Sequence, residues 1–443
     1  MNRVVSVTQN AIQRDSRAYK VAASLTRFGY ESVVFEAEPS SFDRKELPFE
    51  LFTVGEASPA PAPEPGDPQD ASGAGGEGSR TERTRPVGLL ATLFARLPDG
   101  LQTRLGPLAS WALERTVRAL EPAYVLTAMA RNNLRLLCTL PPADLYYMHH
   151  FAHFPAAWLL GKRHRARLLY DAHDANFEPD PALLASFRNQ RTMRMLESID
   201  RAFARRADAF LTVGDGVAAL LERSYGRRPQ VVRNYHDFRM DRESPLDVRS
   251  AAGLGEDDFL LVMTGATKPG DTVEEGLAAL ALLPAQVHLA LVGKGHQQHG
   301  DLISHHGLEG RVHAIEPVPP TEVAGYIRTA DASPILYRPL SENYRQALPN
   351  RFSHAVAAGL PILYPTSLPE IASRCERFEM GLPIEPAEPY SIAGAVERLL
   401  GDPGLRERLR VNVRSAHDEL SWEHEEAVLA PLVGGLVKRS GGA

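Results

Sequence analysis

Apolar and polar positions at the start of the chain follow a strand–helix–strand pattern. The short apolar run from Val4 to Val7 predicts a buried strand, and the amphipathic stretch from Asp15 to Phe28, which ends before Gly29, predicts a helix. The next strand is expected from Glu31 to Phe35. This order favours a parallel sheet, whose ligand crevice lies at the carboxyl ends of the strands.

The same kind of pattern continues and then repeats after a break. More strands are expected at 145–147, 167–170, 209–213 and 230–232, with a charged helix from Arg191 to Arg206. Residues 235–255 are polar and aperiodic, which predicts a boundary between domains. A second series of strands follows at 259–263, 288–292, 312–315, 332–337 and 362–364, separated by predicted helices at 273–283, 297–306, 321–329 and 390–400. We therefore expect two α/β domains, 1–235 and 256–420, and a final segment, 421–443.

Two segments of the first half depart from this pattern. Residues 56–87 are rich in Pro, Ala, Gly, Glu and Ser and have no periodicity, so we expect a disordered insertion. Residues 89–140 have a helical pattern rich in Leu, Ala and Arg. These helices either pack on the sheet or form a face for a membrane or an acceptor. The first interpretation is favoured because amphipathic helices are usually half-buried.

Composition narrows the class of protein. The chain has 443 residues, 44% hydrophobic and 23% charged, which is typical of a soluble protein with more than one domain. Its net charge of −6 provides no basic field for nucleic acid. Cys138 and Cys375 lie far apart, which argues against a disulfide scaffold and favours a reducing compartment. The polar start and the absence of a run of about 20 apolar residues predict a cytoplasmic protein.

The strongest chemical signal lies between residues 332 and 361. A predicted strand leads into a polar loop and a short helix, with Pro349 in its first turn and Gly359 after its last. Free N–H groups at such a helix start attract anions, and phosphate above all. Glu342 and Asn343 in the loop are placed to bind hydroxyls of the molecule that carries the phosphate.

This segment, Ser341 to Leu363, resembles the donor-site segment of GT-B glycosyltransferases of the family 4 type. Weaker similarities, in the same order along the chain as in that family, run from Asn10 to Trp422, apart from residues 56–140. The resemblance implies two Rossmann-like domains that face each other across a cleft, and a UDP- or GDP-linked sugar as donor. It also implies that the final segment, 421–443, contains a helix that returns to the first domain. It places a group of residues around the donor: Glu342 on the sugar, with Asn343, Tyr344, Leu348, Asn350 and His354 nearby. His354 stands where the family usually has a glutamate that binds ribose.

Two glycine turns complete the donor side. Gly265 and Lys268 follow the first strand of the second domain, and Gly293 follows the next strand. A lysine beside such a turn can neutralise a diphosphate leaving group. Family members often have a basic residue at the following helix, where this chain has Glu275, so we expect Lys268 and Arg351 to supply the positive charge. The Gly293 turn would approach the base or ribose through its backbone.

The first domain carries a second group of polar residues at its predicted strand ends. Asp15 either caps the first helix or lines the acceptor side, and Arg17, a cation at a helix start, is expected to face a bound anion. By resemblance, His149 contacts the transferred sugar, and His173 binds sugar hydroxyls. Histidine and aspartate at adjacent strand ends also suggest a metal site, but their spacing matches no known chelate, and the resemblance implies a metal-independent enzyme without a cofactor.

The expected function is retaining transfer of a sugar to a glycan, lipid-linked or small-molecule acceptor, with a role in polysaccharide biosynthesis. The departing diphosphate would assist deprotonation of the acceptor, and a peripheral contact with the inner membrane face is part of this expectation. One alternative is a non-catalytic nucleotide-sugar-binding subunit, motivated by His354 and Glu275. A nicotinamide-dependent oxidoreductase is disfavoured because the first turn, residues 6–11, lacks the Gly-x-Gly-x-x-Gly pattern.

Overall fold

The computed structural model describes residues 1–55, 99–175, 177 and 190–440. The insertion expected over 56–87 lies outside these residues, as does the first part of the helical segment up to residue 98. The described part of that segment forms one helix, α3 (Asp99–Thr139), where more than one helix was expected.

The first domain is built on a seven-stranded sheet in which all neighbouring strands are parallel. Its strand order is β3-β2-β1-β4-β5-β6-β7. The order reverses between β1 and β4, so the carboxyl ends of these two strands form the switch point at which ligands bind in such sheets. The strands are β1 (Arg3–Thr8), β2 (Glu31–Glu36), β3 (Glu50–Thr53), β4 (Leu145–Met148), β5 (Arg167–Ala172), β6 (Ala209–Thr212) and β7 (Gln230–Val231).

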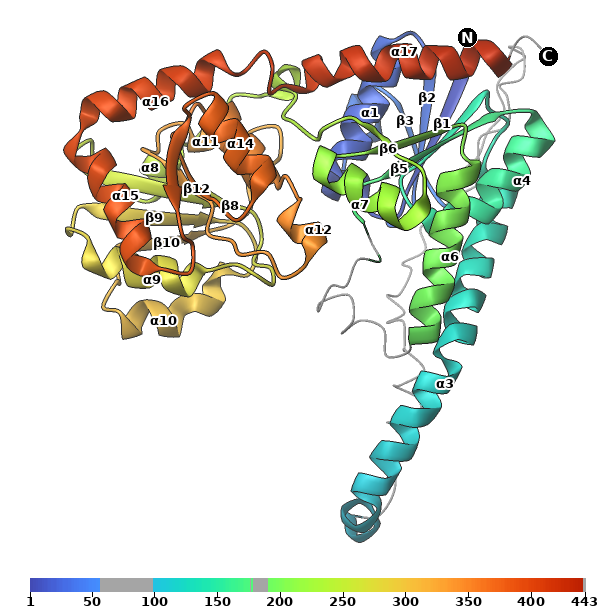
Figure 1. The fold of residues 1–443 in the computed structure, drawn as a ribbon, viewed down its shortest axis with the longest axis horizontal. Coiled ribbons are helices and arrows are strands. Elements are labelled where there is room, and N and C mark those ends of the chain that lie inside the picture. Colours follow the sequence, from blue (N-terminus) through green and yellow to red (C-terminus); the bar gives the residue numbers. More distant parts are fainter. Residues whose placement is uncertain (56–98, 176, 178–189, 441–443) are drawn as a thin grey trace, which may run out of the picture.

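Helices cover both faces of this sheet because successive strand side chains alternate between the faces. Val4 packs with α1 (Ser16–Arg27) and α17 (Trp422–Ser440), whereas Val5 and Val7 belong to the opposite core. The opposite face is covered by the end of α3, α4 (Phe154–His164), α6 (Gln190–Arg206) and α7 (Asp215–Tyr225). Beyond the sheet, α3 continues alongside α6 as a long arm (Figure 1).

The second domain has two three-stranded ladders, β10-β9-β8 and β11-β12-β13. A parallel bridge between Leu261 and Ala332 joins them, with a hydrogen bond from the Val262 N–H to the Ala332 carbonyl at 3.0 Å. Because β8 and β11 meet at this bridge, their carboxyl ends form the switch point of the second domain. The strands are β8 (Phe259–Thr264), β9 (Val287–Val292), β10 (Val312–Ile315), β11 (Ser333–Pro334), β12 (Ile362–Pro365) and β13 (Gly381–Ile384).

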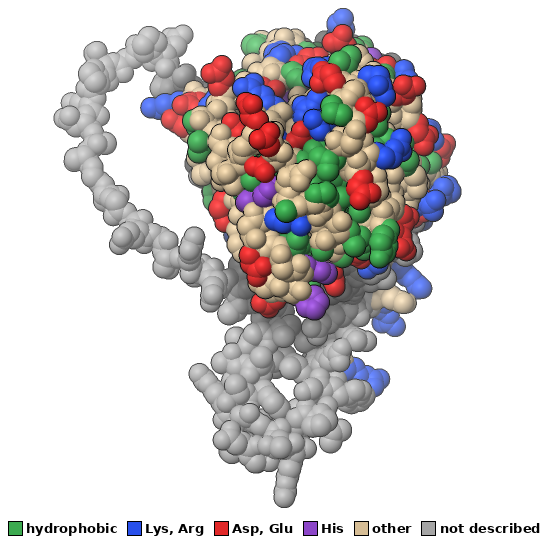
Figure 2. Space-filling model, turned by 90° about the vertical axis from the view of Figure 1, so that its left-hand side faces the viewer, with side chains coloured by type: hydrophobic (Ala, Val, Ile, Leu, Met, Phe, Trp, Pro, Cys, Tyr) green, Lys and Arg blue, Asp and Glu red, His purple; other side chains and the backbone are tan. Residues whose placement is uncertain are grey.

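Helices also lie on both faces of the second sheet. One core contains α9 (Val273–Leu282), α10 (Gly300–His305) and α15 (Pro389–Gly401). The opposite face carries α11 (Val323–Ile327), α13 (Asn350–Ala357) and α14 (Pro369–Arg377). Three further helices are α8 (Val248–Ala251), α12 (Glu342–Arg345) and α16 (Pro403–Ser415). On the outer face of this domain, basic and acidic side chains are interspersed (Figure 2).

The last helix returns to the first domain. Trp422, at the start of α17, is fully buried, and its indole N–H donates to the Ser24 hydroxyl on α1 at 2.8 Å. The Lys20 ammonium lies over the indole ring, 5.0 Å from its centroid. α17 then packs on α1, β4 and β5 (Figure 1). The first core is thus completed by residues from the far end of the chain.

Among the described helices, none combines the length and hydrophobicity needed to cross a bilayer.

Candidate functional site

Two backbone turns meet at the carboxyl ends of β8 and β9. The Gly265 N–H donates to the Val292 carbonyl at 2.9 Å, and Gly293 has a φ of 154°. A Cβ at Gly293 would lie 2.2 Å from the Gly265 carbonyl oxygen, so no side chain fits between the turns. Gly265 itself has a φ of 104°, in the region that favours glycine. The two predicted turns therefore form one compact backbone surface at the switch point.

Beside these turns, the predicted cations Lys268 and Arg351 lie close together. Both lie against the ring of Tyr337: the Lys268 Nζ is 4.2 Å from its centroid, and the Arg351 guanidinium carbon is 6.0 Å away. Arg351, only 5% exposed, pairs with Asp271 at 3.0 Å. Desolvation of the Lys268 ammonium, together with the nearby Arg351, lowers the pKa of Lys268 to about 8. Because Asp271 compensates Arg351, the net positive charge where the sequence predicts a diphosphate comes from Lys268, which has no ion pair among the described residues.

Helix α13 starts next to this charge. Pro349 is its N-cap residue, one position earlier than expected, and Gly359 has the left-handed φ of 69° expected after the last turn. His354 on α13 lies with its Nδ1 3.0 Å from the Thr264 hydroxyl at the end of β8. Burial, followed by nearby cationic groups, lowers the pKa of His354 to about 3, so the imidazole is neutral. His354 is therefore a neutral hydrogen-bonding group where a carboxylate was the family expectation.

The predicted polar loop contains one turn of helix, α12. Ser341 caps it by accepting the Tyr344 N–H at 3.2 Å. Glu342 is exposed at the start of this helix, and its carboxylate accepts a hydrogen bond from Gln346 at 2.8 Å. Tyr344 and Leu348 are half-buried against the core of the second domain. Among the predicted donor residues of this loop, Glu342 is the one with an exposed charged group.

Asn343 and Asn350, predicted to bind the donor, contact the first domain. The Asn343 side-chain oxygen accepts the Ala175 N–H at 2.8 Å, and its amide nitrogen lies 3.2 Å from an Asp174 carboxylate oxygen. The Asn350 side-chain oxygen accepts a hydrogen bond from Asn234 at 3.1 Å. These asparagines therefore link the two domains, and their binding of donor remains a prediction.

A third link joins α14 to α7. Glu370 on α14 accepts the Gly216 N–H in the first turn of α7 at 2.9 Å and is 7% exposed. A Cβ at Gly216 would lie 2.0 Å from the Gln346 side-chain oxygen and 2.8 Å from the Gln346 Cβ, so Gln346 would have to move. A carboxylate at a helix N-terminus is stabilising, so the second domain caps a helix of the first.

In the first domain, Arg17 has an internal counterion. Its guanidinium donates to both carboxylate oxygens of Asp171 on β5, at 2.8 and 2.9 Å, and to the Val232 carbonyl at 2.7 Å. Arg17 and Asp171 are 2% and 0% exposed. The expected bound anion is thus a carboxylate of the protein itself. Asp15 caps α1 by accepting the Ala18 N–H at 3.0 Å, and it also accepts the Thr8 hydroxyl at 2.7 Å.

His149 and His173 come together at the ends of β4 and β5. The His149 Nδ1 lies 3.1 Å from the His173 Nε2 and 3.8 Å from the Asp171 carboxylate. Burial, and then the nearby His173, lowers the pKa of His149 to about 4, so its ring is neutral. The His149 Nε2 is buried and has no hydrogen-bond partner in the described part of the chain. Such an atom is ready to accept or donate one hydrogen bond to a ligand.

His149, Asp171 and His173 also form the one group of described residues whose ligand atoms are close enough for a metal ion, within 4.8 Å of one another. Their chemistry does not suit a cation. Both Asp171 oxygens are engaged by Arg17, and Tyr147 donates to one of them at 2.8 Å. A divalent ion would therefore sit beside a buried guanidinium that already neutralises the carboxylate.

Three charged residues at these sites were not predicted: Asp171, Asp271 and Glu370. Asp171 could have been found, since a carboxylate inside the apolar strand that starts at Arg167 needs a buried partner, and Arg17 was already unexplained. Neither Asp271 nor Glu370 stands in a sequence pattern that points to a partner. Only the folded chain brings them to Arg351 and α7.

Comparisons with known proteins agree with this geometry. Residues 15–235 match the glycosyl transferase 4-like domain, and residues 258–402 match the glycosyl transferases group 1 family. No curated protein matches the chain in sequence.

Solved structures with the same fold cover nearly the whole chain. HepE from Anabaena, solved in complex with UDP, is 15% identical with a TM-score of 0.62, covering 98% of this chain and 100% of its own. Sucrose-phosphate synthase from Thermosynechococcus elongatus is 14% identical with a TM-score of 0.64, over 99% and 100%. WaaG, a glycosyltransferase involved in lipopolysaccharide biosynthesis, is 16% identical with a TM-score of 0.60, over 98% and 100%. The two parallel-sheet domains and the two family matches together show that the chain belongs to the group 1 glycosyltransferases of GT-B fold.

Proposed function

We propose that this chain is a retaining, metal-independent hexosyltransferase that takes its sugar from a UDP- or GDP-linked donor. The observation that carries the donor site is the placement of Lys268 and Arg351 around Tyr337, beside the Gly265 and Gly293 turns. These groups supply two cations and close backbone approach at a switch point, which suits a nucleoside diphosphate. HepE has been solved with UDP, with UDP and glucose, and with UDP-glucose, which supports a nucleotide sugar.

In the proposed reaction, the bond between the anomeric carbon and the diphosphate oxygen breaks, and its electron pair leaves with the diphosphate. The acceptor oxygen forms the new bond to the anomeric carbon on the same face, and its proton passes to the departing phosphate oxygen. Lys268 and Arg351 stabilise the charge that develops on the diphosphate. Glu342 orients the sugar, and the unpartnered Nε2 of His149 is the first-domain group that we assign to a sugar hydroxyl.

Donor turnover by Lys268→Met tests this assignment. The substitution removes one cation while keeping a long side chain, and Lys268 forms no ion pair with any residue that the structure describes. We expect kcat for hydrolysis of the cognate UDP- or GDP-sugar to fall at least about tenfold, because a charged stabiliser of the leaving group is lost. Lys294→Met, at an exposed lysine beside Gly293, is the matched control. Unchanged turnover in Lys268→Met would remove the assignment. Arg351→Ala is a weaker test, since it also leaves Asp271 buried without its partner.

His354 and Glu275 keep a second candidate open: a nucleotide-sugar-binding subunit without turnover. His354 is a neutral ring in place of the family's carboxylate, and Glu275 is an acid in the first turn of α9 where a base is usual. Calorimetry with UDP- and GDP-sugars, combined with a donor-hydrolysis assay, separates the candidates. Binding without turnover of any donor would favour the subunit, and turnover would exclude it.

A further inference from the structure

A cavity of about 340 Å³ lies in the first domain, apart from the donor-side residues. It is bounded by residues that directly follow β1, β2, β3 and β4, and by one side of α3. His150, next in sequence to His149, lines it. The cavity therefore opens at the same sheet edge as the His149–His173 pair, and it has the size of a small-molecule site.

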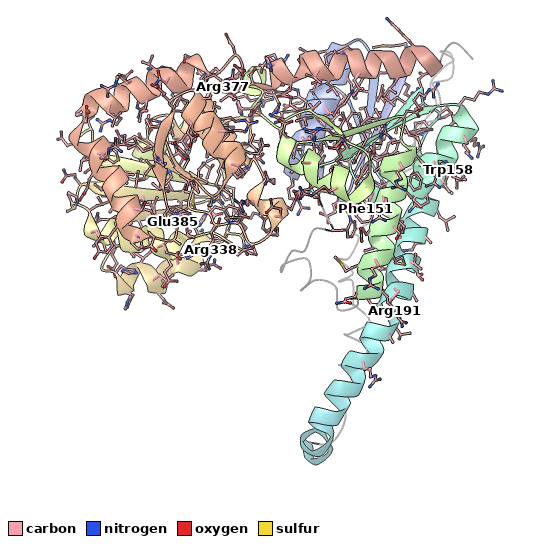
Figure 3. The ribbon with its side chains drawn as sticks, in the orientation of Figure 1. Phe151, Trp158, Arg191, Arg338, Arg377 and Glu385 are labelled. Atoms are coloured by element: carbon pink, nitrogen blue, oxygen red, sulfur yellow. The ribbon has the colours of Figure 1, made fainter. Side chains whose placement is uncertain are left out.

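One wall of the cavity is apolar. It is formed by Val125 and Met129 from α3, Leu196 from α6, and Phe151, which follows β4. Phe151 lies beside α6 in the sheet-end region of this domain (Figure 3). Such a surface favours the apolar face of a sugar ring or a hydrocarbon chain.

The cavity also carries positive charge that no residue of the described part of the chain neutralises. Arg131 and Arg135 stand one helical turn apart on α3, line the cavity and are exposed. Neither guanidinium group forms an ion pair or a hydrogen bond with any described residue. The acidic side chain that lines the cavity, Glu38, is already paired with Arg14. The cavity therefore has a surplus of positive charge.

His150 adds a neutral donor to the same cavity. Its Nδ1 accepts the Ala152 N–H at 3.1 Å, so the neutral ring carries its hydrogen on Nε2. Burial lowers the pKa of His150 to about 3, which keeps the ring neutral near pH 7. The amides of Gln9 and Asn132 also line the cavity. Guanidinium, imidazole and amide N–H groups thus line the same cavity as the apolar side chains.

We propose that this cavity binds the acceptor and that the acceptor is an organic phosphate ester. Its phosphate would lie on Arg131 and Arg135, its apolar part against Val125, Met129 and Phe151, and its hydroxyl toward His149. Guanidinium groups bind phosphate through paired, charge-assisted hydrogen bonds, and a neutral acceptor would leave both arginines unused. The assignment rests on the proposed function and names its second substrate. A water-soluble sugar phosphate and a lipid-linked phosphate share this chemistry.

Calorimetry on the full chain tests the proposal with two matched pairs of probes. Glucose 6-phosphate is compared with glucose, and farnesyl phosphate with farnesol. We expect at least one phosphate ester to bind, and its neutral partner to bind at least about tenfold more weakly. Binding of glucose 6-phosphate would indicate a water-soluble acceptor, and binding of farnesyl phosphate would indicate a lipid-linked acceptor. Equal binding of a phosphate ester and its neutral partner would overturn the proposal.

The double variant Arg131→Gln/Arg135→Gln tests whether the phosphate ester binds in this cavity. We expect it to weaken binding of the phosphate ester at least about tenfold, whereas Arg163→Gln, at an exposed arginine of α4 outside the cavity, should leave the affinity unchanged. Unchanged affinity in the double variant would overturn the proposal.

A UDP titration of the wild-type chain separates the acceptor assignment from the proposed function. If UDP binds and neither phosphate ester does, the acceptor assignment fails and the proposed function stands. If the phosphate ester binds through the two arginines and no nucleotide does, the cavity stands and the proposed function fails.

Discussion

At the scale of single residues, Asp271 controls the charge of the donor side. Its carboxylate accepts the Lys268 backbone N–H at 3.0 Å with one oxygen and pairs with Arg351 at 3.0 Å through the other. The side chains of Arg351 and Asp271 are only 4% and 7% exposed, so each depends on the other for compensation of its charge.

Asp271→Asn should therefore lower the free energy of unfolding by about 3 kcal/mol, because a buried guanidinium loses its counterion. Urea denaturation measures this loss, and Asp301→Asn, at an exposed position of α10, provides the matched control. Since we place the donor diphosphate beside Arg351, saturating UDP should recover part of the loss. A similar small effect in both variants would show that the Arg351–Asp271 pair contributes little.

At the scale of elements, the domains meet where α14 caps α7. Glu370 accepts the Gly216 N–H and also pairs with Arg374 at 2.8 Å, one helical turn along α14. This carboxylate satisfies one of the free N–H groups at the α7 N-terminus that its own N-cap residue, Gly214, leaves without a side-chain acceptor. The contact couples the first turn of α7 to the position of the second domain.

Glu370→Ala should increase amide hydrogen exchange in the first turn of α7 without a comparable change at the end of that helix. The physical reason is the loss of a carboxylate at a partly buried helix N-terminus, which is worth up to about 2 kcal/mol. Glu376→Ala, at an exposed position of α14, is the control. Exchange that is equal in the two variants would mean that Glu370 does not hold α7.

How much the sequence could predict also depends on the element. Long periodic segments such as α1 and β8 were predicted within two residues, because apolar spacing sets them locally. The short strands β3 and β13 were missed, and β13 contains Gly381 and Pro383, which oppose strand prediction. The donor-side glycines and cations lie together in the folded chain, and their role in donor binding stays a prediction. Glu370 was missed because its contact with Gly216 spans 154 residues of the chain, a separation that no local pattern encodes. Asp171 left a local signal, a carboxylate in an apolar strand, but its partner Arg17 is equally distant in the sequence.

At the scale of the whole molecule, several buried histidines make stability depend on pH. His149 is 6% and His153 is 1% exposed, and burial lowers the pKa of each to about 4 from an ordinary value of 6.5. The unfolded chain binds protons at these sites between pH 6.5 and 4, whereas the folded chain does not. Stability is therefore lost as pH falls through this window.

We expect the free energy of unfolding to be lower at pH 5 than at pH 7.5 by about 2 kcal/mol for each such histidine. Urea denaturation at the two pH values measures the change, and His153→Gln should reduce it by about one histidine's share. The exposed His305 serves as control, since His305→Gln should leave the pH dependence unaltered. Stability that is flat from pH 7.5 to 5 would contradict this account.

The placement of α17 has a consequence for synthesis on the ribosome. Trp422, Leu429 and Val433 fill the core between α1 and the first sheet, yet the whole second domain is translated before them. A nascent chain that has finished its amino-terminal half thus carries an uncovered apolar surface along α1, which invites chaperone binding or aggregation. Correct maturation of the first domain must wait until α17 leaves the exit tunnel.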